Sequence, residues 1–112
     1  MPTTNPNAPD ADLIAAALRL AAEHARVIML EEISTTATEE ELGAALERRF
    51  EAAHAVVDAP TAVTIDGAAA TARSLAVMCE ALEGVEWENS PVSALISHLA
   101  ADVENLRGTP AA

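Results

Sequence analysis

The sequence predicts an all-α fold, a four-helix bundle with an up-down-up-down antiparallel order. Half of the 112 residues are apolar (51%), and 27 residues are alanine, which has the highest intrinsic helix propensity. Phe50 and Trp87 are the only aromatic residues, whereas a sheet would need many more aromatic and β-branched side chains. Four amphipathic stretches follow one another between helix start and stop signals. Because the connections are short, consecutive helices should lie antiparallel; a three-helix core with the first helix swapped to a partner chain is the alternative.

A single domain accounts for the length of the chain. Residues 1–9 contain three prolines and no large apolar side chain after Met1, which is typical of a flexible tail. We expect the helical domain to span residues 10–107 and residues 108–112 to form a second flexible tail.

The first helix should begin at Asp10, a favourable N-cap residue, and run to about Ile33. Residues three and four apart form an apolar stripe along it, which consists of Leu13, Ile14, Leu18, Ala21, Ala25, Ile28 and Met29. Residues 27–30 are apolar all round, so this end of the helix should be covered on more than one side.

The second helix should follow a capping box formed by Thr38 and Glu41, in which each side chain binds the backbone N–H of the other residue. It should run to about Asp58, because Pro60 then ends it. Its apolar stripe consists of Leu42, Ala45, Leu46, Phe50, Ala53, Val56 and Val57.

The third helix should begin near Thr64 or Asp66 and end at Gly84, a typical C-terminal glycine. Within residues 67–79 its only charged side chain is Arg73, and both its small-residue face and its large-residue face are apolar. We therefore expect this helix either at the centre of the bundle or in contact with a second subunit.

The fourth helix should begin at Ser90 and Pro91, because serine is a favoured N-cap and proline is favoured at the first helical position. It should stop at Gly108. Its apolar residues are Val92, Leu95, Ile96, Leu99, Val103 and Leu106.

The charge balance excludes some partners. The chain has 18 acidic and six basic residues, all arginine, and a net charge of −12. Such a chain should bind neither nucleic acid nor an anionic membrane, and a protein with a basic surface is its natural partner. Cys79 is the only cysteine, so no internal disulfide is possible, and we expect a buried thiol. No signal peptide or membrane span is evident, which makes a cytoplasmic location the expectation.

Several residue pairs have the spacing of metal ligands, but none completes a site. Glu51 and His54 match the Glu-x-x-His motif of di-iron bundles, which need two such motifs and two further glutamates. His54 and Asp58 are four residues apart, as are His98 and Asp102, and such helical pairs are more often surface pairs than zinc ligands. No phosphate-binding loop or catalytic motif occurs. We therefore predict no metal site, no cofactor and no enzyme activity.

Acidic residues should gather at one end of the bundle. In an up-down order the connections after the first and third helices lie at the same end, and glutamates flank both without a nearby arginine. Trp87 lies in the second connection, and an aromatic anchor inside an acidic rim is typical of a binding site for a basic partner. Solubility and helix capping explain the same charges without a partner. The candidate partner-binding residues are Glu39, Glu40, Glu41, Glu83, Glu86, Trp87 and Glu88.

The second half of the chain carries a resemblance. Residues 59–67 (APTAVTIDG), the alanine-rich helix with Arg73, and the short last helix from Ser93 to Leu106 resemble small all-helical proteins of GC-rich bacterial genomes and prophages, which are mostly uncharacterised. The resemblance implies a bacterial or phage origin and a helical fold, and it implies no activity.

Three hypotheses of function follow. The first is a non-catalytic acidic interaction module that forms a homodimer or binds a protein with a basic surface. The second is an inhibitor, such as an immunity or anti-defence protein, that occupies a basic site by charge mimicry. The third is a metal-binding helical bundle. Steep salt sensitivity of binding would favour the second over the first, and metal analysis of the purified protein tests the third.

Overall fold

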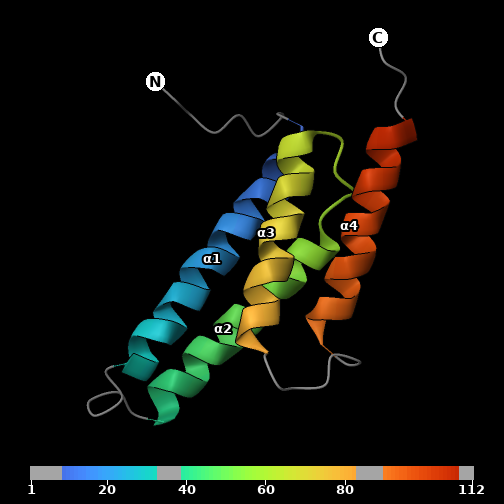
Figure 1. Ribbon diagram of the computed structural model, residues 1–112. Helices are drawn as coiled ribbons and strands as arrows, with labels where there is room; N and C mark the ends of the chain where they lie inside the picture. Colours follow the sequence, from blue (N-terminus) through green and yellow to red (C-terminus); the bar gives the residue numbers. More distant parts are fainter. Residues whose placement is uncertain (1–8, 33–38, 83–89, 109–112) are drawn as a thin grey trace, which may run out of the picture.

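The computed structural model describes residues 9–32, 39–82 and 90–108. Four helices make up almost all of these ranges, in the order α1 (Ala11–Glu32), α2 (Glu39–Asp58), α3 (Ile65–Ala81) and α4 (Pro91–Gly108) (Figure 1). The described residues include no strand, which confirms the predicted all-α class. Thr38, Gly84 and most of the two predicted tails lie outside the described residues.

The start signals of two helices are confirmed. Thr64 is the N-cap of α3, and its side chain accepts a hydrogen bond from the backbone N–H of Gly67 at 3.0 Å. Ser90 precedes α4, and its Oγ accepts from the N–H of Val92 at 3.2 Å. Side-chain oxygens satisfy helix N–H groups that have no partner within the helix, which is why these residues mark the boundaries.

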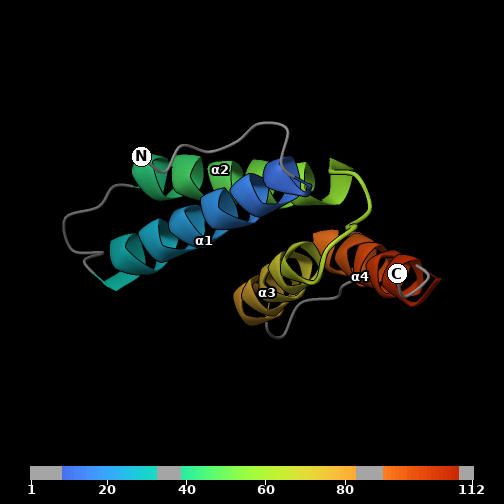
Figure 2. The same cartoon turned by 90° about the horizontal axis from the view of Figure 1, so that it is seen from above.

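The helices pack as a bundle of two pairs. The α1/α2 pair lies across the α3/α4 pair (Figure 2); α1 packs on α2 and α3, and α4 packs on α3 and α2. The described helices α1 and α4 make no contact, and α2 touches α3 only slightly. In the simplest sequential bundle α1 and α4 are neighbours. Here the segment of residues 59–64 instead carries the chain diagonally from α2 to α3.

The core lies on a different face of α1 from the one predicted. Leu20 and Val27, which were not part of the predicted stripe, are almost fully buried. Within the predicted stripe Leu13 is buried, but most of the other residues are exposed: Leu18 is 68% and Met29 48% accessible. Both faces of α1 are apolar, so periodicity alone does not decide which one is buried. The positions of α2 and α3 decide it.

A small second cluster extends the α1/α2 contact beyond the main core. Val27, Leu30 and Ala45 are buried there, with Leu42 packed against them. Residues 27–30 were predicted to be covered on more than one side, but Ile28 and Met29 face outward. The prediction was wrong because α3 ends before it reaches this part of α1.

Candidate interaction surface on helices α1 and α3

Asp10 joins the start of α1 to the start of α3. Its carboxylate accepts hydrogen bonds from the N–H of Val63 (3.0 Å), the N–H of Thr64 (2.8 Å) and the hydroxyl of Thr64 (2.5 Å). Only its backbone C=O serves α1, by accepting from the N–H of Ile14 at 2.9 Å. Asp10 has a φ of 65°, a left-handed conformation that aspartate tolerates. Asp10 directly precedes α1, as predicted. Its carboxylate binds across to α3, so the prediction that the side chain caps α1 was wrong.

A glycine makes this close approach possible. A Cβ placed on Gly67 would overlap the carboxyl group of Asp10, so no other residue fits in the first turn of α3 without a shift. Because both helices start at this junction, α1 and α3 run side by side in the same direction. This parallel pairing forms the two walls of the groove described below.

A buried polar network fixes the connection between α2 and α3 onto α4. Asp102 is fully buried, and its Oδ1 accepts from the N–H of Ala62 at 2.8 Å. Its carboxylate lies 3.0 Å from His98 Nδ1, and His98 Nε2 lies 2.9 Å from the C=O of Ala59. Asn105 donates to the C=O of Ala62 at 2.9 Å. The prediction that His98 and Asp102 form a surface pair was wrong, because the connection crosses over α4 and covers them.

The two ring nitrogens of His98 both have partners in this network. A carbonyl oxygen only accepts, so His98 Nε2 carries a proton and donates it to Ala59. Nδ1 and the Asp102 carboxylate are engaged with each other, and Thr71 Oγ1 lies 3.5 Å from Nδ1. Both ring nitrogens therefore lie within hydrogen-bond distance of an oxygen atom. The arrangement holds the fold in place.

A second set of charged residues lies between α1, α2 and α3. Arg49 Nη1 donates to His24 Nδ1 at 3.2 Å, and His24 Nε2 lies 3.9 Å from Glu80, too far for a hydrogen bond. Burial lowers the pKa of the Arg49 guanidinium, and the carboxylate of Glu31 partly offsets this. Beside this set, Arg48 pairs with Glu23 of α1 at 3.2 Å. In the described part of the chain, no group of three or more His, Cys, Asp or Glu residues is placed to hold a metal ion.

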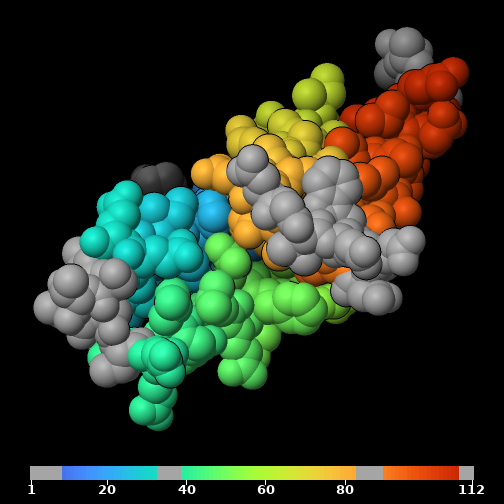
Figure 3. Space-filling view, turned by 60° about the horizontal axis from the view of Figure 1, so that its bottom comes forward, coloured from blue at the N-terminus to red at the C-terminus, as the bar shows by residue number. Residues whose placement is uncertain are grey.

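The glutamates of the described helices lie at two levels. Glu39, Glu40 and Glu41 are exposed in the first turn of α2, next to Glu31 and Glu32 at the end of α1. Glu80, in the last turn of α3, lies level with His24, eight residues and about 12 Å before the end of α1. Figure 3 shows the end of α1 and the start of α2 (cyan to green) to one side of the end of α3 (orange). The other candidate residues of the acidic end, Glu83, Glu86, Trp87 and Glu88, lie outside the described residues.

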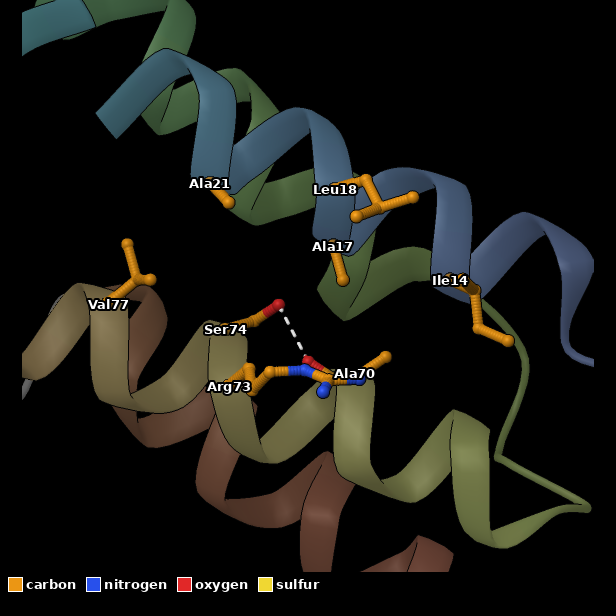
Figure 4. Close-up of a pocket in the computed structure, with 8 residues that line it drawn as sticks. All are labelled: Ile14, Ala17, Leu18, Ala21, Ala70, Arg73, Ser74 and Val77. Carbon is orange, nitrogen blue, oxygen red and sulfur yellow. Dashed lines mark hydrogen bonds between the residues drawn. The ribbon is translucent and has the colours of Figure 1, made fainter. Parts of the chain in front are cut away.

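An apolar groove runs between α1 and α3. It has a volume of about 100 Å³ and is lined by Ile14, Ala17, Leu18, Ala21, Ala70, Arg73, Ser74 and Val77. Figure 4 shows Ala17 and Ala21 pointing from α1 toward α3, and Val77 pointing back toward α1. The hydroxyl of Ser74 donates to the C=O of Ala70 at 3.0 Å, so it leaves the groove floor without a free donor.

The exposed face of α1 continues this groove over the rest of the helix. Leu18, Ile28 and Met29 are exposed, as are the small residues between them, Ala21, Ala22 and Ala25. Sequence reasoning identified this stripe but assigned it to the core. Other exposed apolar side chains form shorter sets, Leu46 with Phe50 on α2 and Ile96 with Val103 on α4. Phe50 has its own contact, an edge-on stacking on His54 with ring centroids 4.5 Å apart.

Comparison of the chain with protein-family models, curated proteins and solved structures gives no match. None of the described helices is both long enough and apolar enough to cross a membrane. The surface itself is therefore the basis for a functional proposal.

Proposed function

We propose that this chain is a non-catalytic protein-interaction module that binds its partner through the exposed apolar face of α1 (Leu18, Ala21, Ala22, Ala25, Ile28 and Met29). The observation that carries the proposal is that a complete helical stripe, from Leu18 at 68% to Met29 at 48% accessible, has no covering element among the described residues. Contiguous apolar surface of this kind is typical of interaction sites.

Covering this face supplies part of the free energy that partner binding requires. Fully burying an exposed Leu, Ile or Met side chain contributes about 1.5–3 kcal/mol. The exposed fractions of Leu18, Ile28 and Met29 together equal about one and a half such side chains. They contribute about 2–4 kcal/mol before the alanines and the groove are counted. Micromolar binding requires about 8 kcal/mol, so the face needs additional polar contacts.

The acidic end supports the same proposal at longer range. A net charge of −12 attracts a partner that carries a basic surface and speeds its encounter. The glutamates around the end of α1 and the start of α2 are exposed, as such an encounter requires. We also infer that the four helices alternate in direction.

Site-specific photo-crosslinking in the cells that produce the protein tests this proposal. A photoreactive residue at Ala22, on the exposed face of α1, should give a discrete cross-linked species, and Leu18→Asp should remove it. The same residue at Ala100, exposed on α4, is the matched control and should give none. A species of twice the mass of the chain would identify a second copy as the partner. Equal cross-linking from Ala22 and Ala100 would contradict the proposal.

A further inference from the structure

The six arginines of this acidic chain differ in whether they have a partner among the described residues. Three are paired within the described residues: Arg48 with Glu23, Arg49 with His24, and Arg107 with Glu104. The other three, Arg19, Arg26 and Arg73, are exposed, and none forms an ion pair with any described residue. All three unpaired arginines lie along the apolar surface of α1 and α3.

Two of them form one rim of this surface. In a helix each residue turns by about 100°, so Ala17 and Arg19 lie on opposite sides of Leu18. Ala17 lines the groove on the side of α3, which places Arg19 on the far side. Arg26 is seven residues later and lies on the same line. Glu23 is between them in sequence, but it is turned to Arg48 of α2.

Arg73 forms the opposite rim. It lines the groove from α3, and Figure 4 shows its side chain lying along the surface of that helix near Ala70. The apolar side chains of α1 thus lie between one arginine on α3 and two on the outer side of α1.

Acidic residues are absent from the middle of this surface. Residues 13–30 of α1 contain one acidic side chain, Glu23, which is paired, and residues 67–79 of α3 contain none. Asp12 and Asp66 lie at the starts of the two helices, and Glu80, Glu31 and Glu32 lie at the other end. Apart from the paired Glu23, the acidic residue closest in sequence to Arg19 or Arg73 on the same helix is seven positions away, and Arg26 has Glu31 five positions away.

We propose that the surface between α1 and α3 binds an amphipathic helix of a partner protein, and that this helix carries carboxylates on both sides of its apolar residues. This inference rests on the proposed function and specifies the segment of the partner that docks here, which is distinct from the basic surface that the acidic end attracts. Arginine is the residue best suited to such contacts, because its guanidinium donates two parallel hydrogen bonds to one carboxylate.

A helix fits this surface better than a small molecule does. The groove volume of about 100 Å³ is below the roughly 300–1,000 Å³ of small-molecule pockets. It is also smaller than the roughly 150 Å³ cavity that holds a benzene molecule, and it suits the end of one aliphatic side chain. The exposed stripe from Leu18 to Met29 repeats at intervals of three and four residues over about 16 Å, which is the pattern of anchors that a docked helix presents.

A second copy of this chain fits less well. In a two-fold dimer the same patch of each copy meets itself. The rims with Arg19, Arg26 and Arg73 would then approach arginines, and two chains of net charge −12 would be brought together. A helix with acidic flanks has the complementary charge.

A selection from displayed helices tests the inference. The library fixes leucines at positions i, i+4 and i+7 of an amphipathic helix and randomises the flanking positions among Glu, Lys, Gln and Ala. Helices selected on the purified wild-type chain should be enriched in Glu over Lys by about threefold or more at both flanks. The chain with Arg19→Glu, Arg26→Glu and Arg73→Glu should reverse this preference, and the corresponding glutamine variants should abolish it. Arg107→Glu, on the exposed end of α4, is the control and should leave it unchanged.

The outcomes separate this inference from the proposed function. Leu18→Asp should remove the selected helices, and Ile96→Asp, an exposed apolar position of α4, should retain them. If helices selected on the wild-type chain are enriched in Lys at the flanks, and Leu18→Asp removes their binding, the inference of an acidic helix would be overturned while the proposed binding face would stand. If the wild-type chain is a dimer that Leu18→Asp converts to a monomer, a second copy of the chain would replace the acidic helix as the partner, and the proposed binding face would again stand. Helices that bind equally to Leu18→Asp and Ile96→Asp, or no selected helix at all, would overturn both.

Discussion

The polar groups at the start of the α1/α3 pair have partners, whereas the arginines along the outer face of the pair have none among the described residues. Where the helices begin, the Asp10 carboxylate accepts three hydrogen bonds from Val63 and Thr64, and a few residues away Asp102 and His98 hold the connecting segment. Along the outer face, apolar side chains and arginines have no partner among the described residues. Buried polar groups with complete partners fix one structure, whereas an unpartnered surface is available for binding. The first region specifies the fold, and the second is the candidate for function.

The largest effect should come from the buried network. Replacing Asp102 by alanine leaves the N–H of Ala62 and the ring of His98 without their acceptor. We expect Asp102→Ala to lower the free energy of unfolding by about 2–4 kcal/mol, since each buried polar group left without its partner costs about 1–3 kcal/mol. Urea denaturation followed by circular dichroism measures it. Glu104→Ala, exposed on the same helix, should change the value by less than about 0.5 kcal/mol. A loss below about 1 kcal/mol for Asp102→Ala would mean that the network does not hold the connection.

A comparison of two leucines on α1 should give the next largest effect. Leu20 is fully buried and Leu18 is 68% accessible. Leu20→Ala should cost about 3 kcal/mol through lost burial and a residual cavity, while Leu18→Ala should cost less than about 0.5 kcal/mol. Thermal or urea unfolding of the two variants decides it. Similar losses from both would show that the face with Leu18 is covered in the free protein.

The smallest of these effects concerns two glycines. Gly67→Ala should destabilise the protein by about 1–3 kcal/mol, because the new methyl group overlaps the Asp10 carboxyl group. Gly43, inside α2, has open space where a Cβ would lie, with no atom within 4 Å, and Gly43→Ala should stabilise by about 0.5–1 kcal/mol through helix propensity. The double variant Gly67→Ala with Asp10→Ala should lose less than the two single losses combined. Additive losses would mean that Asp10 and Gly67 do not interact.

Local signals in the sequence were sufficient to predict the helices. Helix boundaries depend on residues within a few positions of the helix end, so the caps at Thr64 and Ser90 and the end at Asp58 could be predicted from the sequence. The buried face of α1 could not be predicted from such local signals. Its two sides are both apolar, and only the position of α3, set by contacts between residues more than 50 positions apart, decides which side is buried.

The candidate site was less accessible to sequence reasoning for the same reason. That Arg19, Arg26 and Arg73 border one surface depends on the parallel pairing of α1 and α3, which begins at the Asp10–Thr64 contact. His98 and Asp102 have the spacing of an ordinary surface pair, and their burial comes from the path of residues 59–62 over α4. Glu39, Glu40 and Glu41 were placed correctly in the first turn of α2. Their role in binding stays a prediction.

The central claim, that the outer face of α1 is open in the free protein and covered by a partner, is tested most directly by thiol labelling. With the single native cysteine removed by Cys79→Ala, a cysteine is introduced by Ala22→Cys on this face, by Leu20→Cys in the core, or by Ala100→Cys on α4. The first and third should react rapidly with a maleimide in the free protein, and the second much more slowly. Addition of a bound helix should protect only the Ala22→Cys variant. Slow labelling of Ala22→Cys without any partner, or equal protection of Ala22→Cys and Ala100→Cys on binding, would contradict the account.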